Sequence, residues 1–261
     1  MSVFLSSQPL WLSFLLAVVI PTIGFIFGLL AVRRIFTVER MTTNNEVAGF
    51  KFAVVGVMYA VLLGFAVIVV WEKFRDAEAA VAQEASAVVA IDRLSPGLGD
   101  DVGVIVRQRL ASYVQVTVTD DWPAMAHGQV SAPASRALQA LYATVLTANP
   151  DTPRKAAVFS EVLNRLDSLT QARRTRLLLA TGVVPGVVWA VLFAGAFLTL
   201  TFTFFFGLRS LGSQLIMTGM LATLIFMALY VAIEIDHPYT GPVSVGPEAM
   251  RVALEGVFQP S

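Results

Sequence analysis

Four long stretches of the sequence contain no Asp, Glu, Lys or Arg, and they constrain the fold more than any other feature. They cover residues 1–32, 52–71, 177–208 and 210–233. About 20 consecutive apolar residues suffice for a helix to cross the hydrocarbon core of a bilayer. Only 14% of the 261 residues are charged, against about 25% in an ordinary soluble domain. The pattern excludes a soluble globular protein and predicts a polytopic membrane protein with four spans.

Most of the charged residues lie between the second and third stretches, where apolar residues recur at helical spacing. We therefore predict an all-α fold with four transmembrane helices and a soluble helical domain inserted between spans 2 and 3. β-branched residues at 114–119 leave a strand open as a local alternative. Pro185 is expected to divide the long third stretch, so that only its later part spans. The predicted segments are a hairpin of spans 1 and 2 (1–71), the soluble domain (72–176), a hairpin of spans 3 and 4 (177–235) and a polar C-terminal tail (236–261).

Composition excludes several kinds of chemistry. The chain has no Cys and two His, and its 18 Lys and Arg balance its 18 Asp and Glu. Cysteine-ligated metal sites are therefore excluded, and no overall basic field exists to attract nucleic acid. Nucleophile elbows, zinc-protease motifs and glycine-rich phosphate loops are absent from the sequence. We predict no enzyme activity, no cofactor, no metal site and no nucleic-acid partner.

Span 2 carries a stripe of small residues at spacings of three and four, which places them on one face of a helix. The stripe consists of Gly49, Ala53, Gly56, Ala60 and Gly64. Two interpretations stay open. The face can pack closely against another helix, as small residues permit in membranes. Alternatively, this face, or the neighbouring one with Phe52, Tyr59, Leu63 and Val70, lines an axial conduit.

Charged residues gather where the predicted spans end. Glu46 and Lys51 precede span 2, Glu72 follows it, and Asp236 follows span 4. In a symmetric oligomer each would repeat as a ring that can select ions. The alternative is that these charges only mark where lipid stops. Arg173, Arg174 and Arg176, just before the third stretch, are expected to bind phospholipid head groups.

Motifs along nearly the whole chain after span 1 resemble those of the bacterial bestrophin-like family of membrane proteins. They are Asn45-Glu46 with Gly49-Phe50, the run from Tyr59 to Phe65, Trp71-Glu72, Glu84-Ala85, Tyr113, Asp121-Trp122-Pro123, Arg173, Arg176-Leu177, Pro185, Trp189 and the run from Asp236 to Gly241. At positions 121, 237 and 239 the family more often has Glu, Arg and Phe.

The resemblance implies a fold and a function. Bestrophins are pentameric ion channels with four membrane-helix segments and a helical cytosolic part between the second and third. The expectation is a homo-pentamer in the bacterial inner membrane, with span 2 nearest the axis and inorganic ions, weakly cations, as its cargo. Neither a calcium clasp nor the aromatic neck motif of animal bestrophins is recognisable, so calcium gating is not implied.

Two questions stay open at this point. Arg33 and Arg34 after span 1 favour an outside N-terminus under the positive-inside rule, whereas the resemblance favours a cytoplasmic soluble domain, which we adopt. The alternative function is a structural or signalling membrane protein whose soluble domain recruits partners.

Overall fold

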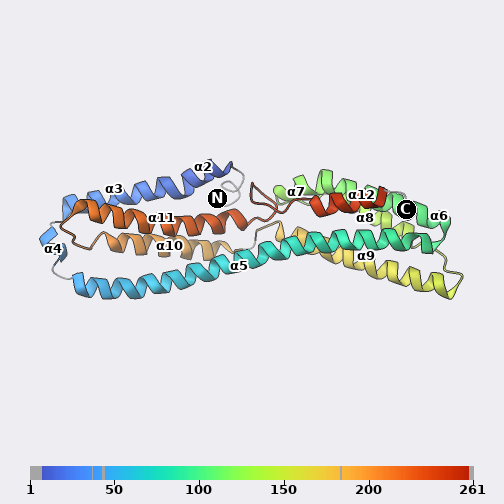
Figure 1. Cartoon of the computed structure of the whole chain (residues 1–261), viewed down its shortest axis with the longest axis horizontal. Helices are drawn as coiled ribbons and strands as arrows, with labels where there is room; N and C mark the ends of the chain where they lie inside the picture. Colours follow the sequence, from blue (N-terminus) through green and yellow to red (C-terminus); the bar gives the residue numbers. More distant parts are fainter. Residues whose placement is uncertain (1–7, 37, 43–44, 183, 259–261) are drawn as a thin grey trace. The chain divides into compact units, whose positions relative to one another are not determined.

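A computed structural model describes residues 8–258 of the chain, apart from 37, 43, 44 and 183. Residues 1–7 and 259–261, which belong to the predicted first and last segments, lie outside the described residues. The described chain is helical and contains no strand (Figure 1). It divides into two compact units. The first comprises residues up to 72 together with 183–236, and the second comprises 73–182 together with 237–261.

The first unit contains the four helices that are long and apolar enough to cross a membrane. The first span runs from Leu10 to Ile35 as α2 (Leu10–Phe14), the π-helical turn η1 (Leu15–Val19) and α3 (Ile20–Ile35). After the short α4 (Val38–Thr42), the other three spans are provided by α5 (Asn45–Leu94), α10 (Gly186–Thr203) and α11 (Leu211–Ile235). These helices confirm the predicted number of spans. Within this unit α11 contacts both α3 and α10 (Figure 1).

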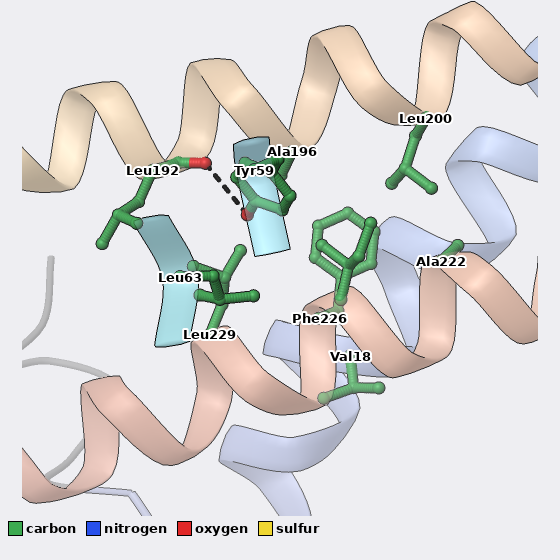
Figure 2. Close-up of a cluster of buried hydrophobic side chains, with 10 residues drawn as sticks. Val18, Tyr59, Leu63, Leu192, Ala196, Leu200, Ala222, Phe226 and Leu229 are labelled. Atoms are coloured by element: carbon green, nitrogen blue, oxygen red, sulfur yellow. Dashed lines mark hydrogen bonds between the residues drawn. The ribbon is translucent and has the colours of Figure 1, made fainter. Parts of the chain in front are cut away.

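The core of this unit is apolar and draws on all four spans (Figure 2). Tyr59 of α5 donates a hydrogen bond to the backbone oxygen of Leu192 in α10, at 3.2 Å. A Cβ atom at Gly195 would lie only 2.6 Å from the Tyr59 ring, so this close approach needs a glycine. Because lipid is as apolar as this core, the contacts are held by van der Waals packing and interhelical hydrogen bonds rather than by exclusion of water.

The second unit begins within α5, which continues without a break to Leu94. Its remaining elements are η2 (Ser95–Leu98), α6 (Asp100–Val116), the π-helical turn η3 (Thr117–Asp121), α7 (Trp122–Ala126), α8 (Ala132–Val145), α9 (Pro153–Leu179) and α12 (Glu248–Phe258). The strand alternative at 114–119 is therefore wrong. Ser131 and Thr152 cap α8 and α9 by accepting hydrogen bonds from the backbone N–H groups three residues on.

Residues after 236 differ from the predicted polar tail. They belong to the second unit, and α12 buries Met250 and Ala253. The indole N–H of Trp122 donates to the backbone oxygen of Val245 at 3.1 Å, which fastens the segment before α12. Pro185 does interrupt the third stretch as predicted, because α9 ends at Leu179 and α10 begins at Gly186.

Gly103 sets how closely α6 approaches η2. A Cβ at this position would lie 2.4 Å from the backbone oxygen of Ser95. We expect Gly103→Ala to destabilise the protein by about 1–3 kcal/mol through overpacking, lowering the thermal unfolding midpoint in detergent by roughly 2–12 °C. Gly256→Ala is the matched control, since a Cβ there meets nothing within 4 Å. Equal midpoints for the two variants would contradict this prediction.

Candidate functional site

The nine residues of α5 predicted to pack or line a conduit separate onto two faces. Tyr59 and Leu63 are buried in the core that α5 forms with α10 and α11 of the same chain. Phe52, on the same side, stacks on Phe202 of α10 with ring centroids 5.8 Å apart. Side chains of the chain itself occupy this face at Tyr59 and Leu63, which favours packing over a conduit there.

The small-residue stripe lies beside this buried face and is not covered in the same way. Ala53, Ala60 and Gly64 are exposed, and Gly49 and Gly56 are half-buried. A Cβ at Gly56 or Gly64 would meet nothing within 4 Å, and one at Gly49 would only reach the ring of Phe206 at 4.0 Å. The stripe is therefore open within a single chain along most of its length. It is available to another copy of the chain or to a conduit.

A cavity of about 520 Å³ opens at the beginning of α5. Asn45 stands at its edge and makes two hydrogen bonds to Gly207: its Nδ2 donates to the backbone oxygen at 2.9 Å, and its Oδ1 accepts from the backbone N–H at 3.1 Å. Gln214 donates from Nε2 to the backbone oxygen of Phe206 at 2.9 Å. These contacts fix the turn between α10 and α11 against the start of α5. They give the Asn45-Glu46 motif a structural role.

Three of the four predicted mouth charges face outward and one does not. Glu46, Lys51 and Glu72 have exposed side chains near the ends of the membrane-spanning part of α5. Asp236 is only 2% exposed, and its Oδ1 accepts a hydrogen bond from the backbone N–H of Val184 at 3.1 Å. Asp236 therefore fastens the segment before α10, which corrects its assignment as a mouth charge.

The second unit holds a buried cluster of charges around Arg176. Its guanidinium donates to both carboxylate oxygens of Glu84, from Nε at 2.6 Å and from Nη2 at 3.0 Å. Nη2 also reaches Oδ2 of Asp121 at 3.0 Å. Glu84, Asp121 and Arg176 have no exposed surface. The three residues come from α5, η3 and α9, so the cluster ties three elements together.

Further side chains that contact the two carboxylates complete the charge balance of this cluster. Arg173 contacts Asp121 at 3.3 Å and is the second guanidinium, so two positive charges face two carboxylates. The hydroxyl of Tyr113 donates to Oε1 of Glu84 at 2.5 Å. The Trp122 ring lies 4.7 Å from the Arg176 guanidinium carbon, within cation–π range. Every charge is therefore paired, as a buried charge requires.

The pKa directions agree with this pairing. Burial raises the pKa of the Tyr113 hydroxyl well above its usual range, and the neighbouring Glu84 charge raises it further. Burial alone would lower the pKa of Arg176, but the Glu84 carboxylate more than offsets this and the net pKa is raised. Arg176 therefore stays charged and Tyr113 stays neutral near neutral pH.

Arg173 and Arg176 are therefore not available to phospholipid head groups, which corrects the expectation from sequence. Both are buried against carboxylates. Arg174, one position along the same helix, is exposed. In the sequence, Glu84, Tyr113 and Asp121 stand out only as residues of the family motifs. A signal for Glu84 existed, because it shares helical spacing with the buried Val81, Ala85 and Val88.

The fold and this arrangement define a class of protein: a helical membrane protein with four spans and a helical unit inserted after the second. A bestrophin-like domain matches residues 17–250, and the chain belongs to the bestrophin-like family. No curated protein matched the sequence.

Crystal structures of a bacterial bestrophin homologue from Klebsiella pneumoniae have a similar fold. One variant is 15% identical, with a TM-score of 0.70 over 91% of this chain and 99% of that one. Another is 17% identical, with a TM-score of 0.69 over 92% and 96%. A third structure of the same homologue is 15% identical, with a TM-score of 0.67 over 90% and 96%. At these identities the likeness shows the fold.

Removing Arg176 should strongly destabilise the protein. Arg176→Met leaves the buried Glu84 and Asp121 short of a counter-charge, which is expected to cost about 3–5 kcal/mol. Arg174→Met, at an exposed position of the same helix, is the control and should change stability by less than about 0.5 kcal/mol. Thermal unfolding in detergent compares the two variants. If Arg176→Met were as stable as Arg174→Met, the buried cluster would not hold the unit together.

Proposed function

We propose that the chain is one subunit of a homo-oligomeric ion channel, a pentamer, with α5 nearest the axis. The observation that carries this proposal is the division of α5 into two faces. One face, with Tyr59 and Leu63, fills the core of its own chain. The small-residue stripe beside it has open space at Gly56 and Gly64. An apolar helix whose small residues lack a partner in the monomer is suited to close contact with neighbouring copies.

Membership of the bestrophin-like family supports the same activity, because bestrophins are ion channels. The structures of similar fold are named as bestrophin homologues. The family also supports the absence of enzyme activity. We place the protein in the bacterial inner membrane with its second unit in the cytoplasm. Bilayer lipid is then its constant partner, and the exposed Arg174 contacts anionic head groups.

Selectivity in such a channel would be set at the ends of α5. The membrane-spanning part of this helix has no charge between Lys51 and Glu72, so its wall cannot distinguish a cation from an anion. Glu46 and Glu72 would form carboxylate rings, while Lys51 and Lys73 oppose them. Because Glu72 follows the apolar stretch directly, we propose a weak preference for cations.

The oligomer and its flux are tested together with Gly56→Leu. If the stripe packs against a neighbour, the leucine forces the helices apart at a cost of about 1–3 kcal/mol, and native mass measurement shows smaller species. If it lines a conduit, the oligomer stays intact and ion flux into liposomes falls. Val54→Leu is the control, because two residues along a helix places it on nearly the opposite side, where it is exposed.

Three outcomes would contradict this proposal. A native protein that stays monomeric across mild detergents and nanodiscs would exclude an axial conduit. An intact oligomer with unchanged flux in Gly56→Leu would exclude both roles of the stripe. If the native protein were oligomeric but passed no ions, the alternative of a structural or signalling protein that recruits partners through its second unit would take its place.

Charge preference is tested by reversal potentials in asymmetric KCl. The native protein should favour K⁺ over Cl⁻, and Glu72→Gln should shift the reversal potential toward that of an unselective pore. Glu78→Gln is the matched control, since Glu78 is also an exposed carboxylate of α5 but lies beyond its apolar stretch. Anion preference in the native protein, or equal shifts in the two variants, would contradict the assignment to Glu72.

A further inference from the structure

A group of oxygen atoms gathers where the first span begins and the last span ends. Ser13 of α2 has no exposed surface, and its Oγ donates a hydrogen bond to the backbone oxygen of Leu10 at 3.2 Å. The hydroxyl of Tyr230 in α11 shares a hydrogen bond with Ser13 Oγ at 3.1 Å and donates to the same Leu10 oxygen at 3.3 Å. The Phe14 ring meets Tyr230 edge-on at 5.7 Å, which positions this hydroxyl. Three oxygens from two spans are thus mutual neighbours.

Glu234 adds a carboxylate to this group. It follows Tyr230 by four residues and therefore lies on the same face of α11. Its polar neighbours are the hydroxyls of Ser13 and Tyr230, and no cationic side chain of the described chain is among them. Glu234 is 3% exposed, and within the described residues neither of its carboxylate oxygens has a hydrogen-bond partner.

A buried carboxylate without a counter-charge is costly, and more so beside lipid. The charge cluster of the second unit shows how this chain satisfies other buried carboxylates, because Glu84 and Asp121 each contact an arginine. Glu234 lacks such a partner. No described residue therefore supplies its counter-charge, and a cation from solution can do so.

We propose that Glu234, Ser13, Tyr230 and the backbone oxygen of Leu10 form a binding site for a sodium ion. All the donors are oxygens, which suit hard cations. One carboxylate neutralises one positive charge, whereas calcium usually takes six to eight oxygens from several ligands. Na⁺ has nearly the radius of Ca²⁺, and metal–oxygen distances of about 2.3 Å put adjacent ligands of an octahedron about 3.3 Å apart. The spacing of the three oxygens matches this value.

The size of the site also distinguishes sodium from potassium. The longer metal–oxygen distances of K⁺ would require the three oxygens to move apart, and two of them are fixed on one helical turn of α2. The contact of Tyr230 with Leu10 is exposed, so the group of oxygens reaches the surface of the chain. The ion would link the beginning of span 1 to the end of span 4. This proposal does not depend on the protein being a channel.

The test measures thermal unfolding of the full chain in detergent at constant ionic strength, with NaCl, KCl or N-methylglucamine chloride. The midpoint should rise with Na⁺ in a saturable way and should rise less with K⁺. Glu234→Gln should abolish the sodium-dependent rise. Ser13→Ala should weaken the apparent sodium affinity by about tenfold or more, since removal of even outer-shell partners costs 10- to 100-fold. Glu255→Gln, at an exposed carboxylate, is the matched control and should retain the native response.

Direct binding of ²²Na⁺ to the purified protein gives a second readout that does not depend on the stability of a variant. Saturable binding that unlabelled Na⁺ displaces better than K⁺, and that is weakened in Ser13→Ala, would support the site. Equal midpoints in the three chlorides would overturn the proposal. So would a midpoint that depends on pH but not on Na⁺, because Glu234 would then be neutralised by a proton.

Discussion

The pairing of Arg176 with Glu84 and Asp121 is the interaction on which the second unit depends most. It joins α5, η3 and α9, whose residues are far apart in the sequence, through a guanidinium with no exposed surface. A buried ion pair of this kind contributes little net stability compared with a well-packed apolar core. Its effect is to permit one arrangement of the three helices, because any other arrangement leaves a charge unpaired. The π turn η3 serves the same end, since Asp121 is its last residue and is fully buried.

The first unit is organised by a different constraint, since lipid surrounds it rather than water. Moving an apolar side chain out of contact with lipid gives little gain in free energy. The shapes of the helix surfaces therefore decide which of them pack together. Gly195 admits the Tyr59 ring, and Asn45 fastens the turn at Gly207 through its two hydrogen bonds. The stripe of small residues on α5 follows the same rule but has no partner in its own chain. In a single chain this surface is therefore largely uncovered.

Much of the fold could be predicted from the sequence, because charge-free stretches and helical spacing depend only on residues that are close together in the chain. The four spans, the unbroken α5 and the interruption at Pro185 follow from length and residue type alone. The faces of α5 could not be distinguished, since the face toward α10 and the face toward lipid are equally apolar. Arg173 and Arg176 were expected to bind lipid because they lie next to a span. The sequence looks the same whether such an arginine binds a head group or a buried carboxylate. The same limit hid Glu234, which the sequence placed only at the end of a span. The helix α12 was missed because its apolar face is short. Only the contact of this face with α6 shows that the segment packs in the second unit.

The order in which the buried charges are synthesised has a consequence for how the protein is made. Glu84 precedes Arg176 by 92 residues, which takes roughly 5–20 s of synthesis at the usual rates of elongation. During that interval two spans have emerged, while Glu84 and Asp121 lack their partner Arg176. Both carboxylates must stay hydrated until α9 is complete, so the interior of the second unit closes late. The nascent chain therefore passes through a stage in which its membrane anchor is in place before its soluble part can fold, and any factor that protects the nascent chain has to act within that interval.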